Sequence, residues 1–197
     1  MAEIMQFDSG ELTREVVASI KGQKQIHVIF STFGEREASL IYEKISLLRE
    51  NLGDLVDTIY LSHRRAGDDE EKTEQMARKA DHNTEILICN NLEVPDMGAE
   101  KGKGADMRRA LYHINTTKVK NNSDDHIVIF LDADVVPQYF GAHFVTGLAG
   151  AVLKGNDFAK ASFWREMGRV KKYVAQPLFS VIDHPGLEKL PQLAYPL

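Results

Sequence analysis

Four short apolar runs, separated by longer segments of helical periodicity, constrain the fold of this chain more than any other feature. The runs are rich in β-branched residues and are bounded by polar residues, which is typical of buried strands. They cover residues 26–30, 55–61, 85–89 and 127–131. Their alternation with helical segments predicts an α/β fold: a Rossmann-like, mostly parallel sheet with helices on both faces.

The segment 35–52 between the first two runs is the clearest predicted helix. Ile41, Ile45, Leu48 and Leu52 fall on one helical face, and a glycine that can end the helix follows at position 53. Further helices are predicted over 103–114, 140–153 and 168–181, and a further strand over 158–164.

Composition and charge exclude several classes of protein. A chain of 197 residues with 43% hydrophobic and 27% charged residues is an ordinary globular chain, and we expect one domain. Its net charge of -5 argues against nucleic acid as a partner. A single cysteine, Cys89, excludes an intrachain disulfide framework, and its apolar run predicts a buried strand position. No apolar stretch is long enough for a membrane span and no signal-peptide core is present, so we expect a cytoplasmic protein.

Polar clusters follow each of the four runs. Because a ligand site of a parallel sheet lies at the carboxyl ends of its strands, these clusters are the candidate site. They cover residues 31–37, 62–69, 90–104 and 132–134. If the sheet is parallel, all four lie on one rim.

Asp132 and Asp134 give the strongest signal in these clusters. Positions i and i+2 of a strand share a face, so the two carboxylates leave the strand end together and repel each other unless a cation joins them. Mg²⁺ or Mn²⁺ with a diphosphate would supply that cation, since such ions use one or two carboxylates and phosphate oxygens. A solvated turn or a helix N-cap is the alternative.

The loop 98–104 holds three glycines and two lysines just before a predicted helix. Glycines let backbone N–H groups approach an anion, and a helix start favours negative charge, so Lys101 or Lys103 could meet a phosphate or a base carbonyl. The spacing is not that of a Walker A loop, and an exposed surface loop is the alternative. Glu35 and Glu37 stand where a helix begins, where they also fit a simple interaction with its dipole.

In this order the residues resemble nucleotide-sugar-dependent glycosyltransferases of the A-type fold, and among them the glucosyl- and mannosyl-3-phosphoglycerate synthase group. The stretch Phe-Gly-Ala-His-Phe-Val-Thr-Gly-Leu at 140–148 is the most specific part of the resemblance. Three stretches carry it: 130–135 with 140–148, 102–104 with 107–108, and 168–170 with 174–178.

The resemblance implies a role for several residues. On the donor side, the base would be lined by Thr32, Phe33 and Glu35 to Glu37, and the nucleotide would meet Ser62, Lys103 and Asp132. Asp134 would hold the metal, Mg²⁺ or Mn²⁺, and act in catalysis. On the acceptor side, Arg169 in the loop 168–170 would pair with a phosphate or carboxylate.

The sequence also departs from this family. The turn 63–69 lacks the usual Asp-Gly-Ser type of ending, and Lys171 stands where relatives have a small hydroxyl residue. The last residues, 194–197, look like the start of a longer family motif, so we expect a chain whose C-terminal part is missing. Within one domain over 1–197, residues 20–136 would form the nucleotide-binding half and 137–197 the start of the acceptor half. Apolar surface left by the missing part predicts a homo-oligomer, such as a homodimer.

Three hypotheses follow. The first is transfer of a hexose from UDP-glucose or GDP-mannose to a small anionic acceptor such as 3-phosphoglycerate or glycerate, with a metal at Asp134. The second is a haloacid-dehalogenase-like phosphatase with Asp132 as nucleophile and Asp134 as acid and base, although its strand normally opens the domain. The third is a non-catalytic fragment that binds a nucleotide sugar.

Overall fold

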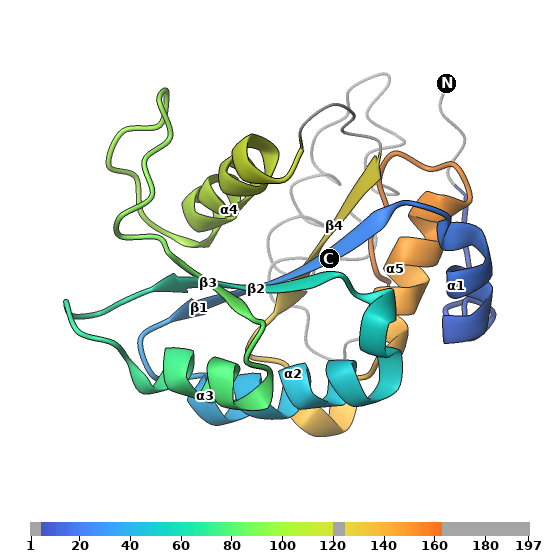
Figure 1. Cartoon of the computed structure of the whole chain (residues 1–197), viewed down its shortest axis with the longest axis horizontal. Helices are drawn as coiled ribbons and strands as arrows, with labels where there is room; N and C mark the ends of the chain where they lie inside the picture. Colours follow the sequence, from blue (N-terminus) through green and yellow to red (C-terminus); the bar gives the residue numbers. More distant parts are fainter. Residues whose placement is uncertain (1–4, 120–124, 163–197) are drawn as a thin grey trace, which may run out of the picture. The chain divides into compact units, whose positions relative to one another are not determined.

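The computed structural model describes residues 5–119 and 125–162 (Figure 1). The chain divides into two compact units, residues 1–157 and 158–197, and the first of them contains all the helices and strands given below. The predicted helix 168–181 and the candidate Arg169 lie outside the described residues. No helix in 5–119 or 125–162 is long and apolar enough to cross a bilayer.

Four parallel strands form the sheet, in the order β3-β2-β1-β4. They are β1 (Gln25–Phe33), β2 (Thr58–Arg64), β3 (Glu85–Ile88) and β4 (His126–Asp132). The register pairs Ser31 of β1 with Ser62 on one side and with Asp132 on the other. The parallel sheet predicted from the four apolar runs is therefore confirmed, and the polar residues that follow three of its strands lie on one edge.

Helices cover both faces of this sheet, as predicted (Figure 1). They are α1 (Arg14–Lys21), α2 (Ala38–Leu52), α3 (Lys72–Ala80), α4 (Lys103–Thr117) and α5 (His143–Leu153), with short 3₁₀ turns η1 (Gly53–Leu55) and η3 (Pro137–Tyr139). Helix α4 packs on one face, and α2, α3 and α5 contribute to the core on the other. Gly53 ends α2 as expected, with φ of 52° and its N–H bonded to the Arg49 carbonyl.

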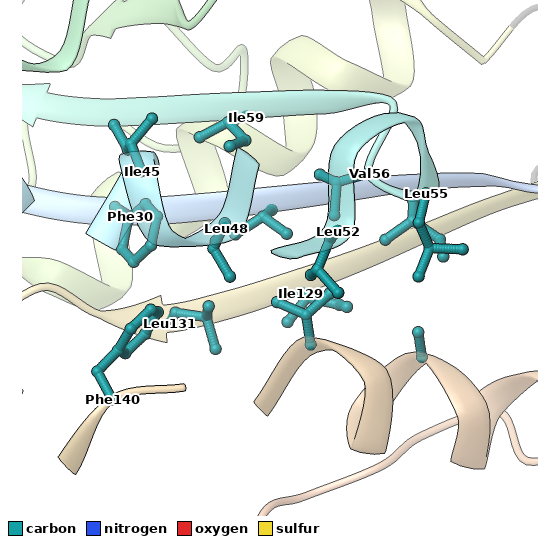
Figure 2. Close-up of a cluster of buried hydrophobic side chains, with 14 of the residues drawn as sticks. Phe30, Ile45, Leu48, Leu52, Leu55, Val56, Ile59, Ile129, Leu131 and Phe140 are labelled. Carbon is teal, nitrogen blue, oxygen red and sulfur yellow. The ribbon is translucent and has the colours of Figure 1, made fainter. Parts of the chain in front are cut away.

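The larger core lies on the face covered by α2 and α5. Alternate residues of β1 divide between the two faces, because Phe30 belongs to the larger cluster and Ile29 to the smaller one under α4. In the larger cluster, Phe30 and Leu48 pack with Leu131 (Figure 2). Burying side chains of this size stabilises the fold by roughly 1.5–3 kcal/mol each. This core fixes the strand ends that carry the site.

Several boundaries differ from the sequence prediction. Helix α2 begins at Ala38 rather than at residue 35, and β2 begins at Thr58 because residues 53–55 form a 3₁₀ turn. Helices α1 and α3 were not predicted, since both are short and α3 is largely polar. The predicted strand 158–164 is wrong over its described part, because residues 158–162 form no strand.

Candidate functional site

A cleft of about 420 Å³ opens at the carboxyl edge of the sheet, beside the N-terminus of α4. Three strand ends and one helix start contribute to it, which is where a parallel α/β sheet binds its ligands. Its lining consists of Ser31, Thr32, Phe33, Glu37, Arg64, Lys101, Gly102, Lys103, Asp106, Ala133 and Asp134. The predicted convergence of the polar clusters is thus observed for β1, β2, β4 and the loop before α4.

The end of β4 forms the acidic wall of the cleft. Asp132 and Asp134 are both exposed, while Ala133 between them is buried. The buried Lys44 of α2 donates from Nζ to the Ala133 carbonyl at 2.6 Å, and its ammonium lies 5.6 Å from the centre of the Phe140 ring. Burial lowers the pKa of Lys44, and the charge of Asp134 opposes that shift. A buried cation therefore holds the turn that presents Asp134.

The start of α4 forms the basic wall. Gly102 precedes the helix with φ of 111°, a conformation that favours glycine, and no side chain caps this N-terminus. Lys101 and Lys103 line the cleft on either side of it. Lys103 also forms an ion pair with Asp132, so it joins the basic wall to the acidic one. Free N–H groups and ammonium groups at one place suit an anion such as a diphosphate.

Arg64 and Asp106 tie this basic wall to the sheet. Arg64 at the end of β2 donates from Nε to Asp106 Oδ2 at 2.9 Å, and its Nη2 donates to Oδ1. The buried Arg109 adds a contact to Asp106 Oδ1 at 3.3 Å and donates to the Leu92 carbonyl. The hydrogen bonds to Asp106 raise the pKa of Arg64. Charge-assisted bonds of this kind fix the first turn of α4 against β2.

The turn after β1 supplies an aromatic ring and a hydroxyl. Phe33 is 49% exposed although it lines the cleft, so its ring is available to a flat ligand. Thr32 is buried, and its Oγ1 lies 2.8 Å from Nδ1 of the fully buried His63. Glu37 also lines the cleft, while the Phe33 N–H donates to its carboxylate at 3.5 Å.

Three predicted site residues, Ser62, Glu35 and Asp132, do not line the cleft. Ser62 is buried under α4, where its hydroxyl contacts the Cys89 thiol at 3.2 Å and the Asp106 carbonyl at 3.4 Å. Glu35 accepts the N–H of Lys72 at 3.0 Å and so caps the start of α3. Asp132 precedes the lining residue Ala133 and reaches the cleft only through its ion pair with Lys103. Cys89 is buried as predicted, and burial raises its pKa to about 11, but it follows β3 rather than lying in the strand.

The acidic wall suits a divalent cation that shares its ligands with a phosphate. Within the described ranges, no group of three or more His, Cys, Asp or Glu residues could hold a metal alone. Asp134 and Asp132 nevertheless fit Mg²⁺ or Mn²⁺, because these ions bind through one or two carboxylates and complete their shell with water and phosphate oxygens. The basic wall beside them is where such a phosphate would be held.

Sequence reasoning missed four residues that build the site. Lys44, Arg64 and Asp106 carry no local motif, because each acts through a partner far along the chain. His63 was passed over because it lacks zinc spacing. The one local signal was Glu71 with Glu74, a capping box that marks the start of α3 and places Glu71 beside His63.

Comparison with solved structures agrees with this architecture. A mycobacterial protein superposes with a TM-score of 0.67 at 24% identity, covering 99% of this chain and 56% of its own. Glucosyl-3-phosphoglycerate synthase from Mycobacterium tuberculosis, in complex with phosphoglyceric acid, matches with a TM-score of 0.66 at 24% identity, covering 98% and 60%. The same enzyme with Mn²⁺, UDP-glucose and glycerol 3-phosphate gives a TM-score of 0.67 at 23% identity, covering 100% and 61%.

The fold is that of an A-type glycosyltransferase. The chain spans about 60% of the length of these enzymes. The sequence matches no protein-family model, and it matches no curated protein either. The A-type fold expected from the sequence is therefore confirmed by structure, while activity and substrates are inferences from the site.

Proposed function

We propose that this chain carries the donor site of a metal-dependent glycosyltransferase, which moves a hexose from a nucleotide sugar to a small anionic acceptor. The observation that carries the proposal is the cleft itself. An exposed carboxylate on Asp134 faces the same space as Lys103 and the uncapped start of α4. A nucleoside diphosphate with a divalent cation needs this combination of opposite charges.

Each wall of the cleft has a part in this function. Lys101, Lys103 and the N–H groups that follow Gly102 bind the diphosphate, and they stabilise the negative charge that grows on it as the sugar departs. Phe33 offers its ring to the base. Asp134 holds the cation, and Lys44 keeps the turn of Asp134 in place through the Ala133 carbonyl. When bound, Mg²⁺ or Mn²⁺ supplies Lewis-acid stabilisation of the leaving diphosphate.

The finer assignments follow the structural neighbours. Those structures are complexes of the synthase with Mn²⁺ or Mg²⁺ and UDP, and with UDP-glucose and phosphoglyceric acid. We therefore propose UDP-glucose ahead of GDP-mannose as donor, and phosphoglycerate or glycerate as acceptor. Arg169 is the proposed partner of the acceptor's phosphate or carboxylate. A cytoplasmic homo-oligomer is the proposed form of the protein.

Binding of a nucleotide sugar without transfer is the second candidate, and the chain spans 60–61% of the length of the synthase. It shares the donor site with the first candidate and differs only in turnover. The phosphatase hypothesis has no such support, since the fold is that of glycosyltransferases rather than of haloacid dehalogenases.

Titration calorimetry on the whole chain tests the proposal. UDP-glucose and GDP-mannose are titrated with Mn²⁺ present and again with EDTA, in the wild type and in Asp134→Asn. Asp54→Asn, an exposed acidic position in η1 before β2, is the matched control. We expect metal-dependent binding of one donor, lost in Asp134→Asn and kept in Asp54→Asn. The donor site would be refuted if the folded protein bound neither donor, or if binding were unchanged both by EDTA and by Asp134→Asn. Glucose transfer to phosphoglycerate then separates an enzyme from a binding protein.

A further inference from the structure

Behind the cleft, three side chains from different elements form one hydrogen-bonded chain. Thr32 Oγ1 of β1 lies 2.8 Å from His63 Nδ1 of β2, and His63 Nε2 lies 2.9 Å from Glu71 Oε2 at the start of α3. His63 is fully buried and does not line the cleft, whereas Thr32 does. Of these three residues, only Thr32 lines the cleft.

The contacts of Glu71 fix the direction of this chain. Glu71 Oε1 accepts the N–H of Ala66 at 2.7 Å and that of Gly67 at 3.4 Å, and the carboxylate also caps α3. A carboxylate only accepts hydrogen bonds, so His63 Nε2 is the donor to Glu71 Oε2. A neutral imidazole has one donor and one acceptor, which leaves Nδ1 as an acceptor. The Thr32 O–H then donates to Nδ1, so its oxygen has only lone pairs left for a further partner.

The other charged groups around His63 allow the same assignment. Glu74 Oε1 lies 3.8 Å from His63 Nε2, on the side of Glu71. Arg65 binds Glu74 through two hydrogen bonds of 2.6 and 2.8 Å. Glu74 is thus satisfied by Arg65, and Glu71 remains the acceptor for His63.

From this direction we propose that Thr32 is a specificity-determining residue whose hydroxyl accepts a hydrogen bond from the nucleobase, with His63 and Glu71 as positioning residues. The proposal rests on the donor site proposed above. Uracil carries an N–H at ring position 3, where cytosine carries a lone pair. A hydroxyl that can only accept therefore favours UDP. With CDP, the lone pair of the Thr32 oxygen would face the lone pair of cytosine N3, and no hydrogen bond would form. Sites built on such a hydrogen bond discriminate strongly, because the wrong ligand leaves a buried group unpaired.

Glu71→Gln reverses the direction of the hydrogen bonds from Thr32 through His63 to residue 71, and it changes the shape of the side chain little. The Ala66 and Gly67 N–H groups hold the amide oxygen of the introduced side chain, so its NH₂ group faces His63. That NH₂ group donates to Nε2, which moves the ring proton of the neutral imidazole to Nδ1. Nδ1–H then donates to Thr32, and the Thr32 O–H turns to donate into the cleft. Glu70→Gln removes the same charge one position away, where Glu70 pairs with Arg78 at the surface, and is the matched control.

Two measurements on the whole chain test the proposal at neutral pH. The first is ¹⁵N NMR of the His63 ring, which distinguishes the two tautomers and the imidazolium without any ligand. We expect an Nε2–H tautomer in the wild type and in Glu70→Gln, and an Nδ1–H tautomer in Glu71→Gln. An imidazolium in the wild type, or an unchanged tautomer in Glu71→Gln, would overturn the proposal.

The second measurement is the ratio of UDP to CDP affinity with Mn²⁺ present. We expect the wild type and Glu70→Gln to prefer UDP by roughly tenfold, and Glu71→Gln to lose or reverse that preference. Thr32→Val should lose it and Thr32→Ser should keep it, which tests the hydroxyl itself in folded variants. A switched tautomer with an unchanged ratio would overturn the base contact of Thr32 alone. If neither nucleotide binds to the folded wild type, the proposed donor site is refuted. The NMR result still decides the direction of the hydrogen bonds between Thr32, His63 and Glu71.

Discussion

Arg64 at the end of β2 donates two hydrogen bonds to Asp106 in the first turn of α4, and the one from Nε to Oδ2 is 2.9 Å long. Both side chains are nearly buried, with 11% and 8% exposure. The pair sets where α4 begins relative to the sheet. It thereby sets the distance between the basic wall and the acidic wall of the cleft.

Asp106→Asn should destabilise the protein by about 2–4 kcal/mol, because Arg64 and Arg109 would lose the charge that compensates their burial. Chemical denaturation measures this loss. The control is Asp96→Asn, since Asp96 is 75% exposed and pairs with Arg108 at the surface, where we expect a change below about 1 kcal/mol. Equal losses in the two variants would show that the pair does not hold α4.

Lys103→Met should move the affinities for metal and nucleotide in opposite directions. Lys103 neutralises Asp132 in an ion pair, so its removal raises the affinity for Mn²⁺ alone by roughly threefold. It removes a cation from the diphosphate, so UDP should bind roughly tenfold more weakly. Calorimetry measures both, with the exposed Lys72→Met as control. A parallel change of the two affinities would contradict this role of Lys103.

Two glycines two positions apart should respond differently to alanine. Gly102 has φ of 111°, so Gly102→Ala strains the backbone by about 1–2 kcal/mol and displaces the start of α4. Gly104 lies inside α4 with open space around it, so Gly104→Ala should be neutral or stabilising by up to about 1 kcal/mol. Thermal denaturation compares them. The reverse order would mean that the strained turn before α4 is absent in solution.

Stability should fall as the pH is lowered from about 6.5 to about 4, partly because of His27. This ring is buried against His126, and burial together with the charge of His126 lowers the pKa of His27 to about 4. Between that value and the ordinary value of 6.5, His27 is protonated in the unfolded chain but not in the folded chain, so lowering the pH favours unfolding.

Between pH 6.5 and pH 4, the free energy of unfolding of His27→Leu should fall by about 2–3 kcal/mol less than that of the wild type. Urea denaturation at a series of pH values measures it, with the exposed His82→Leu as control. A pH dependence that is the same in His27→Leu as in the wild type would assign the loss to other groups.

The fold was predictable from sequence because the strands are apolar on both faces. A run such as 127–131 can only be buried, and its alternation with helical segments leaves few arrangements. Helix α3 was not predictable in this way, because a polar capping box starts it and Ala77 is its one apolar residue that is fully buried.

The lining of the cleft was predictable at Asp134, which comes just after β4. It was not predictable where a side chain reaches across the sheet. Lys44 meets the Ala133 carbonyl 89 positions along the chain, and Arg64 meets Asp106 42 positions along. The resemblance implied that Ser62 meets the nucleotide, yet its side chain is buried under α4. Which face a strand-end residue presents depends on register, and register is a tertiary property.

The most direct test of the donor site locates the metal in the presence of nucleotide. Mn²⁺ broadens NMR signals of nearby nuclei, so amide signals are compared with UDP and Mg²⁺ and then with UDP and a small fraction of Mn²⁺. The account predicts broadening centred on Asp134 and the start of α4, and sharp signals at Asp54. Broadening centred on any other part of the chain, or none at all with UDP bound, would contradict it.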